Sequence, residues 1–151
     1  MKHRISVGVI VEEAERLLLV RHVKAGAYDF WVAPGGGLQG TESLLIGARR
    51  EVREETGLDV EPRALAYVEE LVDPETRYVK FWFVGSARGG VLRADQPEAA
   101  RERITEAAWL SRRELAERIV FPPVLLDRYW HDRAAGFAAP VLLPLRRMEF
   151  W

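Results

Sequence analysis

Three glutamates, Glu51, Glu54 and Glu55, follow a run of three glycines at a spacing that suits the binding of a metal ion and a phosphate. Positions i, i+3 and i+4 of an α-helix share one face, so these carboxylates are expected to converge on one patch. Two carboxylates about 4 Å apart repel by about 4 kcal/mol at an effective dielectric constant near 20, so such a cluster favours bound cations. Oxygen ligands suit hard ions, Mg²⁺ first and Mn²⁺ second. The sequence therefore predicts a divalent metal site on this helix.

The glycines Gly35, Gly36 and Gly37 are predicted to be the phosphate-binding half of the same site. A backbone without side chains can approach phosphate oxygens closely. A turn would explain the glycines alone, and a solvated helix face balanced by arginines would explain the glutamates alone. Their joint spacing favours one combined site for a divalent metal ion and a pyrophosphate.

This segment resembles the signature of the Nudix hydrolases, enzymes that cut a nucleoside diphosphate linked to some other group, X. The positions that match the signature are Gly36, Glu42, Arg50, Glu51, Val52, Glu54, Glu55, Gly57 and Leu58. The resemblance implies metal-ligand roles for Glu51, Glu54 and Glu55, with the Gly36 carbonyl as a backbone ligand. The bound ions would then neutralise a phosphoanhydride and activate a water molecule. It also implies a mixed β-sheet sandwiched between helices (α/β/α), with a loop-helix-loop segment as the catalytic platform.

The general base is open between a glutamate of the helix and one from a later loop, because members of the resembled family differ in this respect. Glu102 is the downstream candidate, since it lies seven residues before Trp109, where related chains often carry a glutamate just ahead of a strand. Glu98 and Glu106 compete with it, although Glu106 is expected to alternate outward on the strand. A base must reach the water geometrically, so the choice depends on the structure.

The identity of X is only weakly encoded. The aromatic residues that could stack on a base, or simply fill the core, are Tyr28, Phe30, Trp31, Tyr67 and Trp82. Arg77 and Lys80 are candidate phosphate contacts. Pro74 falls sixteen residues after Leu58, where relatives that act on ADP-ribose also tend to have a proline, and a turn explains it equally well. We take Trp31 and Arg77, with the three glycines, as the predicted substrate contacts.

The preferred hypothesis is a Mg²⁺-dependent pyrophosphohydrolase of small nucleotides, with ADP-ribose or a nucleotide sugar favoured over a nucleoside triphosphate or dinucleoside polyphosphate. A non-catalytic nucleotide-sensing module is the alternative from another class. The net charge of −1 argues against a broad nucleic-acid surface, which ranks RNA decapping lower.

The whole chain of 151 residues is expected to form one domain, 1–151, of α+β class. It has no cysteine, no signal-peptide core and no apolar run that could span a bilayer, so a cytoplasmic protein without membrane contact is expected. The tail Met148–Trp151 is apolar and aromatic, which indicates burial against its own sheet or against a second copy in a homodimer.

The helix behind the glycines is expected to begin at a cap on Thr41 or Ser43 and to end at Gly57 in the left-handed conformation. Glu42 is expected in its first turn, paired with Arg50. The inward stripe, opposite the carboxylates, is predicted to be Leu45, Ala48 and Val52.

The other elements follow from apolar periodicity and from turn residues. Strands are expected at 5–11, 16–23, 30–33, 58–72, 78–87 and 104–110, with helices at 111–118 and 122–133. The first two strands are expected to form a central hairpin. Residues 88–100 are predicted to be irregular, and 141–151 to be a last strand or an arm.

Overall fold

The computed structural model describes residues 1–149. Its strands are β1 (Lys2–Glu13), β2 (Arg16–Lys24), β3 (Tyr28–Val32), β4 (Gly35–Gly37), β5 (Leu58–Val72), β6 (Thr76–Gly90), β7 (Ile104–Ser111), β8 (Val120–Phe121), β9 (Val141–Leu142) and β10 (Arg146–Arg147). Its helices are α1 (Leu44–Thr56), α2 (Pro97–Arg101), α3 (Arg112–Ala116), the 3₁₀ helix η1 (Pro123–Leu126) and α4 (Arg128–Ala134).

Strand β1 lies at the centre of a curved, mixed sheet. It pairs in parallel with β6 from Lys2 opposite Thr76 to Val11 opposite Gly85. On its other edge it pairs with β2 only at residues 12–13, and β4 takes that edge at residues 6–8. The predicted hairpin is therefore confirmed at its turn but is wrong along most of its length, because the glycine strand β4 occupies the place that β2 leaves.

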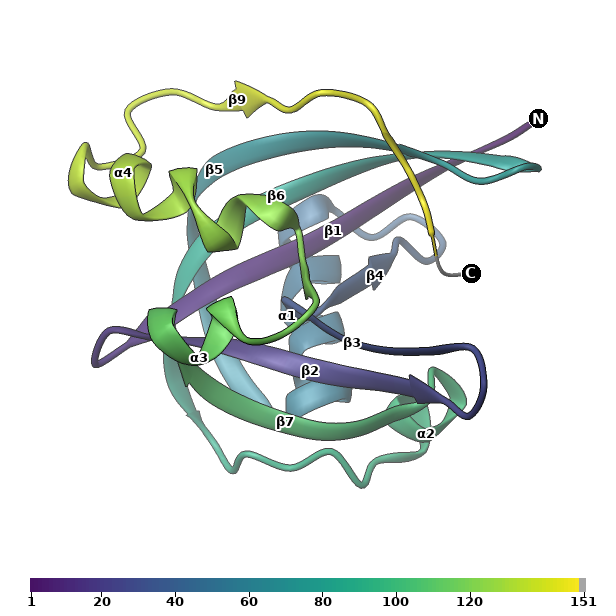
Figure 1. Cartoon of the computed structure of the whole chain (residues 1–151), viewed down its shortest axis with the longest axis horizontal. Coiled ribbons are helices and arrows are strands. Elements are labelled where there is room, and N and C mark those ends of the chain that lie inside the picture. The colour runs from purple at the N-terminus through teal and green to yellow at the C-terminus, as the bar shows by residue number, and fades with distance from the viewer. Residues whose placement is uncertain (150–151) are drawn as a thin grey trace.

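Helices cover both faces of the sheet (Figure 1), so the predicted α+β class with a sheet between helices is confirmed. Helix α1 packs on one face over an aliphatic core that includes Val7, Val9 and Val52. Helices α3 and α4 and the 3₁₀ helix η1 cover the other face, over a larger core that includes Trp82 and Tyr129.

The ends of α1 follow from local sequence signals. The Ser43 hydroxyl accepts a hydrogen bond from the amide of Ile46, and Gly57 ends the helix with φ of 76°. Of the two predicted caps Ser43 is thus the one used. Glu42 precedes the cap instead of lying in the first turn.

The predicted orientation of α1 is wrong in one important respect. Leu45 is 40% exposed, whereas Glu51 and Glu55 are only 5% and 2% exposed and lie on the buried side together with Ala48 and Val52. The helix lies across β4, whose glycines leave room beneath it, so two carboxylates turn inward while Leu45 turns to solvent.

The second half of the chain departs from the predictions at two places. The segment 88–100 is not wholly irregular, because β6 continues to Gly90 and α2 begins at Pro97. The helix predicted at 122–133 is divided at Asp127, whose φ of −140° and ψ of −86° end η1 and whose side chain caps α4. Across residues 1–149, none of the helices has the length and apolar character needed to cross a membrane.

The C-terminal segment runs along the sheet as an arm with two short strands. Both β9 and β10 pair in parallel with β5. The prediction of a last strand or an arm is thus confirmed up to residue 149, and the last two residues of the predicted tail, 150–151, lie outside the described part of the chain. This segment brings Arg146 onto the central sheet.

A tight contact between β1 and β6 gives the first testable prediction. A Cβ atom at Gly8 would lie 2.3 Å from Cζ3 of the buried Trp82 ring. Gly8→Ala is expected to lower the free energy of unfolding by about 2 kcal/mol, because an overfilled core must shift. Denaturant unfolding measures this loss. Gly89→Ala is the control, since its nearest contact is at 4.0 Å, and an equal loss in both variants would contradict the prediction.

Candidate active site

The glycine strand β4 lies directly against helix α1. The amide of Gly35 donates to Oε1 of Glu55 across 3.3 Å. A Cβ atom at Gly36 would lie 2.6 Å from the Glu51 carboxyl carbon, so only glycine fits there without displacing that carboxylate. The glycine segment and the acidic helix therefore lie in contact, as the sequence predicts.

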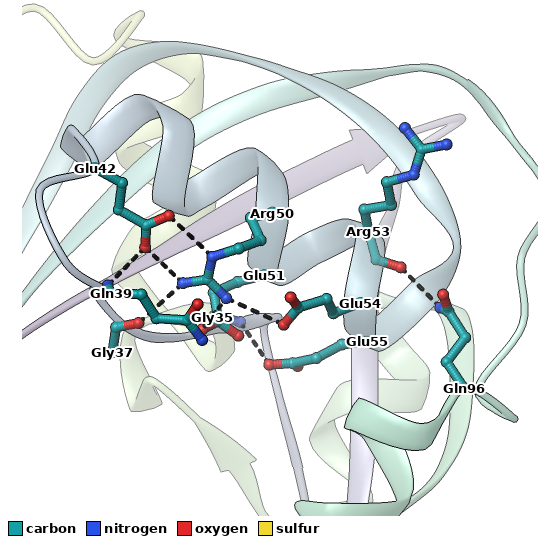
Figure 2. Close-up of polar contacts among 10 residues, drawn as sticks. All are labelled: Gly35, Gly37, Gln39, Glu42, Arg50, Glu51, Arg53, Glu54, Glu55 and Gln96. Carbon is teal, nitrogen blue, oxygen red and sulfur yellow. Dashed lines mark hydrogen bonds and ion pairs between the residues drawn. The ribbon is translucent and has the colours of Figure 1, made fainter.

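Arg50 is the centre of the polar network between the loop and the helix (Figure 2). Its Nη2 donates to Oε1 of Glu42 at 2.6 Å and to the Gly37 carbonyl at 3.1 Å. Its Nη1 lies 3.0 Å from Oε1 of Glu51 and 3.1 Å from Oε2 of Glu54. The predicted pair of Glu42 and Arg50 is confirmed, and the same guanidinium also balances two of the predicted metal ligands.

Glu55 is the most deeply buried acid of the site. Its Oε2 is buried and has no hydrogen-bond partner within the described structure. Burial, followed by repulsion from Glu102 and Glu51, raises the pKa of Glu55 well above its ordinary value. Burial also raises the pKa of Glu51, which Arg50 opposes. The folded state thus disfavours the charged form of both carboxylates, and pKa values perturbed in this way are common at functional sites.

Glu102 joins these acids from the end of α2, as the sequence suggested. Burial raises the pKa of Glu102, while the nearby Lys80 ammonium lowers it. Lys80 is attracted by Glu55, Glu69, Glu51 and Glu102, and burial lowers its own pKa. Lys80 is therefore a cation shared by four of these acids, whereas Arg50 pairs with Glu51 and Glu54.

His22 supports the segment that carries Glu102. Its Nδ1 lies 2.9 Å from the Glu102 carbonyl oxygen, and its ring stacks on Phe30 with centroids 5.1 Å apart. Burial lowers the pKa of His22 to about 4, so the ring is neutral near pH 7 and adds no charge to the cluster.

The donor set fits a hard divalent cation. Within residues 1–149, no three His, Cys, Asp or Glu side chains are already gathered as a metal cage, so the expected convergence of the three carboxylates is incomplete. Carboxylate and carbonyl oxygens are nevertheless the ligands such ions prefer, and the unpartnered Oε2 of Glu55 offers one buried donor atom.

Trp31 and Arg77 are not placed with the acids. Trp31 is 7% exposed and lines a separate cavity with Arg21 and Arg118, whose guanidinium carbons lie 5.9 and 5.7 Å from its ring centroid. Arg77 forms an ion pair of 2.7 Å with Glu70. Nothing described here brings either residue to a substrate, so both roles stay predictions.

The sequence-based prediction missed Glu69 and Arg146 and gave Lys80 too little weight. The register of the β5–β6 hairpin could have found the first contact, because counting back from the turn at 73–76 places Glu69 opposite Lys80. No local signal indicates Arg146, which reaches Oε1 of Glu69 at 3.2 Å from 77 positions further along the chain.

The Arg50 network gives a prediction for stability. Arg50→Gln is expected to lower the free energy of unfolding at pH 7 by about 2 kcal/mol, because it leaves partly buried carboxylates without their cation. Arg50 holds the pKa of Glu42 below its ordinary 4.5. This stabilisation is therefore present above pH 4.5 and is lost as the pH falls through the lowered pKa.

Denaturant unfolding at pH 7 and pH 3 tests this pH dependence. The difference between the natural protein and Arg50→Gln should narrow in acid. Arg53→Gln is the control, because its ion pair with Asp59 is solvent-exposed and contributes at most about 1 kcal/mol. If the difference in unfolding free energy between the natural protein and Arg50→Gln stays constant with pH, the stabilisation does not come from the ion pair of Arg50 with Glu42.

The chain belongs to the Nudix family, because a sequence profile described as NUDIX domain matches residues 2–129. Members of this family are pyrophosphohydrolases that generally use divalent metal ions. The resemblance carried by the acidic helix and the expected Nudix fold are thus confirmed.

Individual relatives agree with this assignment. The chain is 36% identical over 106 residues to an 8-oxo-dGDP phosphatase of Danio rerio, covering 70% of this chain and 31% of the relative. It is also 36% identical over 128 residues to a MutT-like protein of Streptomyces ambofaciens, covering 83% and 76% of the two chains. A solved NUDIX hydrolase from Nitrosomonas europaea superposes with a TM-score of 0.73 at 26% identity, covering 89% and 90%. The chain spans about a third of the length of the 8-oxo-dGDP phosphatases that it matches.

Proposed function

We propose that this protein is a divalent-metal-dependent hydrolase that cleaves a phosphoanhydride bond in a nucleoside diphosphate linked to another group. The observation that carries the proposal is the buried Oε2 of Glu55, which has no partner and lies on a helix packed against a glycine strand. A buried carboxylate oxygen without a partner is costly, and a bound cation would offset that cost.

The residues divide into those that would hold the ion and those that would serve the substrate. Glu51, Glu54 and Glu55, with the Gly36 carbonyl, would hold Mg²⁺ or Mn²⁺. The bound ion would neutralise phosphate charge and acidify a water molecule. The backbone of Gly35 and Gly37 would lie along the phosphates.

Glu102 is the proposed general base of the reaction. Burial raises its pKa towards the working pH, which favours proton transfer. Lys80 stands nearby as the cation for the developing charge.

The choice of substrate within this class is a further part of the proposal. The expected preference for ADP-ribose depended on Pro74, which lies exposed in the β5–β6 turn, and that turn accounts for it. A relative described as an 8-oxo-dGDP phosphatase supports a purine nucleoside diphosphate as the substrate. A nucleotide sugar of the same base would present the same diphosphate to the site.

A substrate panel tests the proposal. The protein is incubated with ADP-ribose, UDP-glucose, GDP-mannose, dGTP and 8-oxo-dGDP in Mg²⁺ or Mn²⁺, and release of nucleoside monophosphate is followed by mass spectrometry. Turnover of at least one compound, abolished by a chelator and restored by added metal, is expected. Tight nucleotide binding without metal and without turnover would instead make the protein a nucleotide sensor and refute the proposal.

A further inference from the structure

A cavity of about 120 Å³ is lined in part by Lys80. Its walls include the aromatic rings of Phe30, Trp82 and Phe121. Glu69 and Arg146 also line it, on adjacent strands of the sheet. This volume is smaller than the roughly 150 Å³ that accommodates benzene, but the cavity is open to solvent, so a flat fused-ring base would enter it in part.

Two hydrogen-bond donors at this cavity have no partner. Trp82 Nε1 and Arg146 Nε are both buried and unpaired within the described structure. Buried polar groups in native proteins are almost always satisfied, so orphan donors on two side chains that line one cavity indicate a missing acceptor.

The cavity also contains a buried acceptor. The Glu69 side chain is only 3% exposed, and its Oε1 accepts from Arg146 Nη2 at 3.2 Å. Lys80 lies opposite it on β6 and stacks over the Trp82 ring at 4.3 Å. The site thus combines flat apolar walls with an anionic acceptor and neighbouring donors.

We infer that this cavity binds the base of the nucleotide substrate and that Glu69, with Arg146 and Trp82, selects guanine. The inference rests on the proposed function and deepens it. Guanine carries two adjacent N–H donor groups, N1–H and the 2-amino group, which a carboxylate can accept together. Its O6 and N7 atoms are acceptors for the orphan donors.

The other bases fit this arrangement less well. Adenine, cytosine and uracil each place a ring acceptor or a carbonyl oxygen next to their only Watson–Crick N–H donor group, so a facing carboxylate would meet a second negative atom. A site built around a buried polar group rejects a ligand that leaves it unpaired.

Lys80 connects this cavity to the chemistry. It lines the cavity and is also attracted by Glu55, Glu51 and Glu102 of the acidic cluster. A base held between the aromatic walls would therefore direct its phosphates past Lys80 towards the glycine strand.

Binding of product-like monophosphates by the natural protein tests the inference without turnover. Calorimetry would compare GMP, IMP, AMP and UMP at fixed Mg²⁺. IMP lacks only the 2-amino group, so GMP is expected to bind at least about 10-fold more tightly than IMP, the size of one hydrogen bond to a charged group. Equal affinity for GMP and IMP would overturn the inference while leaving the proposed hydrolase intact.

A matched pair of variants tests the residue assignment. Glu69→Gln should reduce the preference for GMP over AMP by at least about 10-fold, because an amide cannot accept from both donors. Glu61→Gln, on the same strand, also removes a carboxylate that pairs with an arginine and should keep the preference. An unchanged preference in a folded Glu69→Gln protein, checked by thermal melting, would overturn the assignment. If that variant does not fold, the comparison of GMP with IMP decides.

Discussion

Glu55→Gln is expected to lower kcat for the nucleotide substrate by at least about 1,000-fold while raising the melting temperature. The loss should exceed the 10–100-fold typical of residues that only support metal ligands, because Glu55 offers the buried oxygen proposed to contact the ion. Glutamine keeps the shape of the side chain but has a neutral amide in place of the anion. The activity loss therefore reports on charge and not on packing.

The expected gain in stability follows from the direction of the pKa shift. Burial and the neighbouring acids raise the pKa of Glu55 above its ordinary 4.5, so the folded state resists its ionisation. Glu55 therefore destabilises the fold progressively as the pH rises above 4.5. The glutamine variant avoids that cost at pH 7, whereas Lys80 keeps Glu51, Glu69 and Glu102 as partners. A gain of about 1 kcal/mol corresponds to about 2–4 °C in a chain of this size.

Steady-state kinetics with added Mg²⁺ and thermal melting without added metal, both at pH 7, measure the two effects on one preparation. Glu61→Gln is the control, because its exposed carboxylate pairs with Arg49 and not with Lys80 or Arg50, and it should change neither quantity appreciably. A glutamine variant at position 55 that is both active and no more stable would show that Glu55 is an ordinary buried acid. Loss of activity together with a lower melting temperature would point to a structural role.

Local signals made much of the site predictable from sequence. The cap at Ser43, the left-handed Gly57 and the pairing of Glu42 with Arg50 depend on residues within one helix and its flanks, and the structure confirms all three. The predicted orientation of α1 is wrong at Leu45, because apolarity alone does not identify the buried face of this helix. The glycine strand beneath α1 leaves space for carboxylates, so acids occupy that face instead.

The substrate side of the site was much less predictable, because it depends on long-range pairing. Periodicity predicts a hairpin of β1 with β2, yet the parallel partner of β1 is β6, where Thr76 lies opposite Lys2. The contact between Glu69 and Arg146 likewise requires the C-terminal arm to lie along β5. Periodicity identifies strands but does not say which edges meet, so residues assembled by such pairing escape single-sequence prediction.

Gly36→Ala is expected to lower kcat/KM by at least about 100-fold with little change in stability. The added methyl group would lie 2.6–2.7 Å from the Glu51 carboxyl atoms, too close for contact. Because these atoms end a flexible side chain, the carboxylate can swing away, and the free energy of unfolding should change by less than about 1 kcal/mol. The proposed metal ligand would then leave its place beside Gly36, and a displacement of about 1 Å at a reacting centre can cost about 100-fold in rate.

Gly37→Ala is the matched comparison, since a Cβ atom there meets nothing within 4 Å. Its activity is expected to stay within about fivefold of the natural protein, because the Gly37 carbonyl keeps its bond to Arg50. Kinetics and denaturant unfolding are measured on both variants. They distinguish a specific need for space between Gly36 and Glu51 from a general need for glycine in the loop. If both variants lost activity equally, backbone flexibility of the loop would be the cause. If Gly36→Ala retained full activity, Glu51 could not be held against this strand during the reaction.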